Sequence, residues 1–444
     1  MAASLRSFPL TGADYFVWAL DRQMRRAGLS GNVCRMVVRL EGPVDEVRLR
    51  ARLAGSPILG QLARLRLVRP LPLLSPRWRP VGGELPELLR VHPAPAGSDP
   101  GLVPALPAAD LRPGVAPVLG FDLVRRSQGG DLVLSWHHAL MDVRGADLLL
   151  RHLGRAAPSA AGPAGAFGDP GAAALPALRR WGSYPRRVGF ARGSLAFITT
   201  TCREPLFSLV PAGSPAAGAS NTYRVHWFTP DETSRVDEHG RRLDAGFRRS
   251  QFYLAASVRA LHAVAAKRGD AVGAYVVPVP HDLRRRGAEG PILSNQLSFL
   301  FFRIEAAQTG SLAGMVCELT RQMMDQARGG NPESFRAAME LFRPAPLDFY
   351  VRQVGRPTRG RLATFFFSDA GESCPGLDRL AGAVPTAVTH LAPASCPPGL
   401  TVVFSRFRGR LCFVLSWIDG CLTAREVDEL ERAVCTALLE GDGA

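Results

Sequence analysis

Two adjacent histidines at the end of an apolar run constrain this chain more than any other feature of its sequence. The run 132–136 alternates with a period of two, so successive side chains point to opposite faces of a strand. His137 and His138 therefore leave the strand in opposite directions, and only one of them can face a given cavity. After Asp142 the apolar spacing becomes that of a helix ending near Gly154. The histidines are predicted to lie where a strand passes into a loop, so that a side chain can meet a ligand while the backbone stays fixed.

These residues do not predict a metal site. Zinc would need third and fourth ligands at a recognisable spacing, and none accompanies the two histidines. The eight cysteines occur without a Cys-x-x-Cys pair, which predicts reduced thiols rather than a disulfide framework or a zinc ribbon. We therefore expect neither a metal nor a redox cofactor.

Length and composition exclude several classes of protein. With 444 residues, of which 46% are hydrophobic, the chain is predicted to form two folded domains. It has neither a signal peptide nor a run of 18 uncharged apolar residues, which leads us to expect a cytoplasmic protein.

The net charge of +15 comes almost entirely from arginine, since Lys267 is the only lysine. No basic arm, zinc-finger spacing or aromatic RNA-binding motif accompanies this charge, so nucleic acid is not an expected partner. A positive field would still attract anionic partners, such as the phosphate groups of a ligand, an acidic protein or, through a peripheral contact, the headgroups of a membrane.

The pattern His-His-x-x-x-Asp resembles the signature of the CoA-dependent acyltransferase superfamily. Its members include chloramphenicol acetyltransferase, the condensation domains of peptide synthetases and the wax ester synthase/diacylglycerol acyltransferases. The resemblance implies that His138 is the general base and that Asp142 is an orienting residue. The family's usual residue after the aspartate is glycine, whereas here it is Val143, with Gly145 two places later. The replacement of this glycine concerns the shape of the turn after Asp142 more than the role of His138 as base.

Two other interpretations of the motif stay open. One pairs His137 with Asp142 across four residues, as in the glycerol-phosphate acyltransferases, although the Phe-Pro-Glu-Gly block of those enzymes is absent here. The other is a buried histidine pair without chemistry, in a binding or scaffold protein of the same fold.

Later segments extend the resemblance. Related chains carry an arginine that bridges the motif aspartate across the domains, and Arg284 matches its position. An asparagine precedes the next strand in the family, as Asn295 does here. The segment 362–371 looks like the family's strand that ends Ser-Asn-x-Gly, with Ser368 matching the serine and Asp369 in place of the asparagine.

The expected elements alternate between helices and strands. Helices are predicted at about 10–26, 44–53, 230–240, 247–268 and 423–439, and strands at 33–40, 119–126, 132–138, 222–228, 275–280, 297–304, 362–369 and in a hairpin at 398–417. Residues 70–117 are proline-rich and are expected to be irregular with short strands.

The pattern alone predicts an α+β protein with two domains. The resemblance implies two chloramphenicol-acetyltransferase-like halves with largely antiparallel sheets and an active-site tunnel between them. We expect an N-terminal domain at 1–155 that carries the motif, a linker rich in Ala, Gly and Pro at 156–190, and a C-terminal domain at 191–444.

The resemblance implies transfer of an acyl group from a thioester to a small-molecule or lipid alcohol or amine. The donor would be acyl-CoA or an acyl carrier protein, and the latter would make the chain a condensation-type enzyme. His138 would take the acceptor's proton directly, without an acyl-enzyme, while Asp142 and Arg284 hold the loop. Three residues are candidates for donating a hydrogen bond to the carbonyl oxygen, namely Ser368, Asn295 and Trp417.

Overall fold

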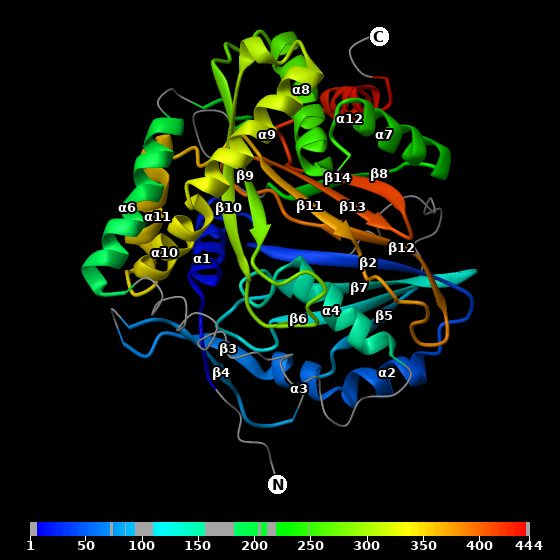
Figure 1. The fold of residues 1–444 in the computed structure, drawn as a ribbon. Helices are drawn as coiled ribbons and strands as arrows, with labels where there is room; N and C mark the ends of the chain where they lie inside the picture. Colours follow the sequence, from blue (N-terminus) through cyan, green and yellow to red (C-terminus); the bar gives the residue numbers. More distant parts are fainter. Residues whose placement is uncertain are drawn as a thin grey trace.

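The computed structural model describes residues 7–71, 74–84, 86–93, 110–155, 182–202, 206–210, 219–246 and 248–440. It has two layered halves, with the strands of the N-terminal half below those of the C-terminal half in Figure 1. Helices lie on the outer side of each half and along one edge of the molecule. The prediction of a mixed α and β fold with largely antiparallel sheets is confirmed.

The N-terminal half is built on a five-stranded sheet with the order β12-β2-β7-β6-β5. Its strands are β2 (Val33–Glu41), β5 (Leu89–His92), β6 (Leu119–Arg126), β7 (Gly129–His137) and β12 (Val384–Leu391). The predicted hairpin is present, since β6 and β7 pair antiparallel across a short turn. β12 comes from the second half of the chain and pairs with β2, so residues from both halves complete this sheet.

Four helices and a small sheet surround it. They are α1 (Gly12–Arg26), α2 (Glu46–Ala54), α3 (Pro57–Arg64) and α4 (Val143–Gly154), with β1 (Phe8–Pro9), β3 (Leu65–Val68) and β4 (Arg77–Pro80) in the sheet. The start of α1 is fixed by a capping box, in which Thr11 and Asp14 each accept the other's backbone N–H. Short strands do occur within 70–117, as expected, and residues 72–73, 85 and 94–109 of that stretch lie outside the described residues.

The C-terminal half contains a four-stranded sheet with the order β11-β13-β14-β8 and a separate antiparallel hairpin of β9 and β10. The strands are β8 (Asn221–Trp227), β9 (Ala274–Asp282), β10 (Leu297–Glu305), β11 (Phe366–Glu372), β13 (Leu400–Phe407) and β14 (Arg410–Ile418). The helices are α6 (Tyr184–Thr201), α7 (Pro230–Arg242), α8 (Arg249–Arg268), α9 (Leu312–Arg328), α10 (Asn331–Phe342), α11 (Leu347–Gly355) and α12 (Ala424–Leu439), with short 3-10 turns η1 (Ala306–Gln308) and η2 (Arg356–Thr358). In Figure 1, α7, α8 and α12 cover the outer side of the four-stranded sheet.

The end of the predicted linker is helical instead of irregular. Residues 156–181 lie outside the described residues, but α6 begins at Tyr184. Pro185 did not prevent this helix, because a proline in the first turn lacks only an N–H that would have no partner inside the helix.

Each half has its own hydrophobic core, and a smaller apolar cluster joins the two sheets. That cluster contains Val37, Val133 and Leu391 from the five-stranded sheet and Cys412 and Val414 from β14. Because the sheets are packed together here, the ends of β2, β7 and β12 lie beside β11 and β13, and the cavity described below opens at this junction. In the part of the chain that the structure describes, no helix has the length and apolar character needed to cross a membrane.

Candidate active site

The two histidines point in opposite directions at the end of β7, as the alternation of the strand predicts. His137 is fully buried, while His138 is partly exposed and lines a cavity. The backbone N–H of His138 donates to the carbonyl of Asn32 at 2.9 Å, which fixes the chain as it leaves the strand.

His137 has a structural role, because both of its ring nitrogens contact groups of the protein. Its Nδ1 accepts the backbone N–H of Ala139 at 3.2 Å, so in the neutral ring the proton is on Nε2. Nε2 lies 3.3 Å from Oδ1 of Asp21 in α1. Burial raises the pKa of Asp21, but the contacts with His137 and the N–H of Asn32 outweigh it, and the net effect is a lowered pKa. His137 thus ties the histidine loop to α1.

His138 presents its other ring nitrogen to the cavity. Its Nδ1 is buried, which leaves Nε2 facing the open space. Burial lowers the pKa of His138, and the backbone carbonyls of His138 and Met141 and the charge of Asp142 oppose this only in part. The ring is therefore neutral near pH 7 and able to accept a proton.

Asp142 and Arg284 form the expected ion pair across the two halves of the chain. The guanidinium donates from Nη1 to Oδ2 at 2.8 Å and from Nη2 to Oδ1 at 3.0 Å, a bidentate geometry. Both side chains are more than nine-tenths buried. Burial lowers the pKa of Arg284, but Asp142 and Asp282 more than compensate, so its pKa is raised.

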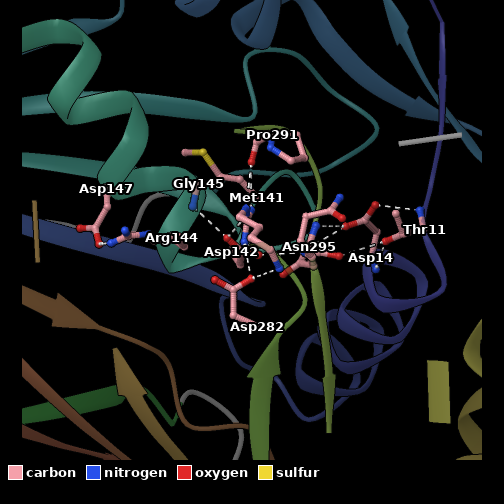
Figure 2. Close-up of polar contacts among 12 residues, drawn as sticks. Thr11, Asp14, Met141, Asp142, Arg144, Gly145, Asp147, Asp282, Pro291 and Asn295 are labelled. Atoms are coloured by element: carbon pink, nitrogen blue, oxygen red, sulfur yellow. Dashed lines mark hydrogen bonds and ion pairs between the residues drawn. The ribbon is translucent and has the colours of Figure 1, made fainter. Parts of the chain in front are cut away.

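The carboxylate of Asp142 is saturated by further donors, as Figure 2 shows. Oδ1 also accepts the N–H of Gly145 at 2.8 Å, which caps α4, and Oδ2 accepts the N–H of Gln296 at 2.9 Å. Among the described residues, the carboxylate of Asp142 hydrogen-bonds to these two N–H groups and to Arg284, and not to His138. Asp142 therefore fixes the loop that carries His138 and does not hydrogen-bond to the imidazole ring of His138.

The departure at Val143 leaves the turn intact. Val143 begins α4 without a positive φ, so the position has no need of glycine in this chain, and its side chain lines the cavity. Gly145 is the glycine that the structure requires. A Cβ atom there would lie 2.4 Å from the carbonyl oxygen of Ile292, in the segment that leads to Asn295.

Replacing Gly145 with alanine is expected to destabilise the protein by about 1–3 kcal/mol, because the added methyl forces the backbone around Ile292 away from α4. The free energy of unfolding in denaturant measures this effect. Gly189 is a matched control, since it is also helical but has open space where a Cβ would lie. Gly189→Ala should stabilise by about 0.5–1 kcal/mol. Equal effects of the two changes would show that the close approach at Gly145 does not matter.

Asn295 holds the histidine loop instead of facing the cavity. Its Nδ2 donates to the carbonyl of His138 and to Oδ1 of Asp14, both at 2.8 Å, so both amide hydrogens are already used. It is therefore not available as a donor to a carbonyl oxygen. Asp14 also accepts the backbone N–H of Asn295 at 2.6 Å, and burial raises the pKa of Asp14 to about 6. Sequence reasoning missed this role of Asp14, because Asn295 is 281 residues away along the chain.

The cavity has a volume of about 520 Å³ and is lined by both halves. Its apolar wall includes Phe16 of α1 and Phe299 of β10, whose rings meet edge to face at 5.3 Å between centroids. Ser368 and Asp369 line it from β11. Trp417 does not line it and packs in the core of the C-terminal half. The structure thus places the predicted base in a cavity between the halves.

Arginine side chains bring positive charge to the lining of this cavity. Arg144, next to the motif, and Arg285 and Arg286, on the segment between β9 and β10, line it. Among the described residues no group of three or more His, Cys, Asp or Glu side chains is placed to hold a metal ion.

No protein-family model and no curated protein matches this chain. Solved structures do match it. The first condensation domain of the CDA synthetase has a TM-score of 0.68 and 19% identity, over 99% of this chain and 98% of that one. The trichothecene 15-O-acetyltransferase TRI3 of Fusarium sporotrichioides has a TM-score of 0.70 and 12% identity, over 98% of this chain and 95% of the enzyme.

A third structure is the polyketide synthase associated protein 5 of Mycobacterium tuberculosis, with a TM-score of 0.62 and 17% identity, over 98% of this chain and all of that one (100%). At these identities the likeness establishes the fold. The chain therefore has the two-lobed fold seen in condensation domains and in the TRI3 acetyltransferase.

Proposed function

We propose that this chain is an acyltransferase that moves an acyl group from a thioester to an alcohol or amine, with His138 as general base. The observation that carries the proposal is the position of Nε2 of His138, which belongs to a neutral ring and faces a cavity lined by both halves of the chain. A thioester and an acceptor that enter this cavity can both reach the same nitrogen.

The reaction follows from this arrangement. Nε2 of His138 accepts the proton of the acceptor's O–H or N–H as the oxygen or nitrogen attacks the thioester carbonyl. The carbonyl oxygen becomes negatively charged and then re-forms the double bond as the C–S bond breaks. The imidazolium returns the proton to the departing thiolate, so the products are the ester or amide and a free thiol, and His138 is neutral again.

Asp142 and Arg284 keep the loop rigid while this happens. A positioned base is effective only if its nitrogen stays within hydrogen-bond reach of the proton that it removes. Of the three residues considered for the carbonyl oxygen, Ser368 is the one that lines the cavity, so its hydroxyl is our choice of donor.

The donor is proposed to carry phosphate groups. Arg285 and Arg286 line the cavity without an ion-pair partner among the described residues, and such cations attract the phosphates of CoA or of a carrier-bound phosphopantetheine arm. We favour acyl-CoA, because CoA carries more phosphate groups than a phosphopantetheine arm does. The second candidate is a condensation-type reaction with carrier-bound acyl groups, which the likeness to condensation domains supports.

The test is incubation of the purified protein with mixed acyl-CoAs and mixed alcohols or amines, followed by mass spectrometry of the products. Free thiol should form only when an acceptor is present, because transfer is direct. A stable acyl adduct in the intact mass of the protein would contradict direct transfer. No product with any CoA or carrier-bound donor would favour a non-catalytic scaffold.

The arginines predict a dependence on salt. The apparent second-order rate, kcat/KM for the donor, should fall with ionic strength much more than kcat, since steering by surface charge is screened over about 8 Å at physiological salt. Replacing Arg285 and Arg286 together with alanine should lower kcat/KM and flatten this dependence. Replacing Arg328 and Arg432, which do not line the cavity, is the matched control. Salt-independent kinetics would show that the arginines do not steer the donor.

A further inference from the structure

Asp369 lines the cavity from the middle of β11, at the position where the family resemblance would place an asparagine. It is partly buried, and together with Ser368 and Ala370 it lines the cavity. Its Oδ1 accepts the backbone N–H of Gly371 at 3.1 Å. The pairing of β11 with β13 becomes irregular after Asp369, so the strand bends here.

Asp369 differs from the other two carboxylates that line the cavity. Asp142 and Asp282 both pair with Arg284, at 2.8 Å and 3.2 Å. No ion pair joins Asp369 to any residue in the described part of the chain. Partial burial of a carboxylate without a cation beside it is unfavourable, which makes Asp369 a favourable place for a cationic ligand.

The charges around Asp369 also favour a cationic ligand at this residue. Burial raises its pKa, and the N–H of Gly371 and the more distant Arg406 and Arg249 oppose this only in part. Both arginines contact another carboxylate, Asp237, at 3.0 Å and 3.7 Å respectively. They are therefore not free to neutralise Asp369.

We propose that Asp369 binds an ammonium group of the acceptor, in addition to the group that reacts at His138. The inference rests on the proposed function, since it names the acceptor of that reaction. The donor is expected beside Arg285 and Arg286, where a cation would be repelled. A cation at Asp369 therefore belongs to the other substrate, which makes a diamine or an amino alcohol with a free ammonium group the expected class of acceptor.

Pairs of ligands of equal length test this proposal without turnover. 1,5-Diaminopentane and hexylamine have the same chain, but one ends in an ammonium where the other ends in a methyl group. Shorter and longer homologues of each pair are titrated as well, so that one length matches the distance between Asp369 and His138. Calorimetric titration should show that the diamine binds at least about tenfold more tightly than its monoamine at one or more lengths, as expected for a charge-assisted contact.

Asp369→Asn keeps the shape and removes the charge, so it should abolish this preference and leave binding of the monoamine unchanged. Asp244→Asn is the matched control, because it makes the same charge change at a fully exposed side chain outside the cavity. Equal binding of diamines and monoamines at every length would overturn the proposal, and so would a preference that survives Asp369→Asn.

The proposed function and the proposed ammonium site can be contradicted independently. A preference for diamines without acyl transfer would support the ammonium site and contradict the proposed function. Acyl transfer without the preference would support the function and contradict the ammonium site.

Discussion

Replacing His138 with alanine is expected to lower kcat by about 10²–10⁴-fold, the usual contribution of a general base. The protein should keep its fold, because the ring faces a cavity and its removal leaves no buried partner without a hydrogen bond. Turnover with acyl-CoA and an accepted alcohol or amine measures the loss of kcat. The thermal unfolding midpoint measures whether the fold is kept.

His137→Ala is the matched control for this prediction. It should act mainly on stability, with a loss of about 1–3 kcal/mol, because it leaves the buried carboxylate of Asp21 without the imidazole beside it. If His137→Ala abolished activity while His138→Ala kept it, the interpretation that pairs His137 with Asp142 would replace ours. If neither change affected turnover, neither histidine would be the general base.

The pH dependence of kcat gives an independent check on His138. The base acts when it is neutral, and burial lowers its pKa below the ordinary value of 6.5. The midpoint of the fall in turnover should therefore lie below pH 6.5, so more than half of the activity at pH 8 should remain at pH 6.5. A fall in activity that is already half complete above pH 6.5 would mean that another group is the base.

Much of the site could be predicted because it depends on local pattern. The alternation of apolar residues before the histidines was enough to separate His137 from His138, since strand geometry alone sends neighbouring side chains to opposite faces. The spacing after Asp142 predicted α4, and Asp142 caps that helix as an aspartate at such a position commonly does. The pairing of Asp142 with Arg284 could be expected only from the family resemblance.

The rest depends on contacts between distant parts of the chain, which no local pattern encodes. Asn295 looked like a donor to the substrate, but Asp14 and the carbonyl of His138 use both its amide hydrogens. The need for glycine at Gly145 arises from the approach of Ile292, which lies on another segment. The strand β12 joins the sheet of the other half, although composition had suggested a clean boundary between two domains.

Asp142→Ala is expected to lose both stability and activity. The change removes one member of a buried pair and leaves the buried guanidinium of Arg284 with only the half-exposed Asp282 as a carboxylate partner, a loss of about 3–5 kcal/mol in the free energy of unfolding. It also removes the cap of α4 and the acceptor for the N–H of Gln296. Denaturant unfolding measures the first effect, and turnover at a temperature where the variant is folded measures the second.

A double variant separates the buried charge from the geometry of the loop. In Asp142→Ala combined with Arg284→Met, no buried charge is left unpaired, because Asp282, the other carboxylate that pairs with Arg284, is about half exposed to solvent. Part of the lost stability should therefore return relative to Asp142→Ala alone. Activity should stay low, because Gly145 and Gln296 still lack the acceptor that fixes the loop beside His138. Full recovery of activity in the double variant would mean that the ion pair serves stability alone, and that His138 is positioned by Asn295 and the backbone of β2.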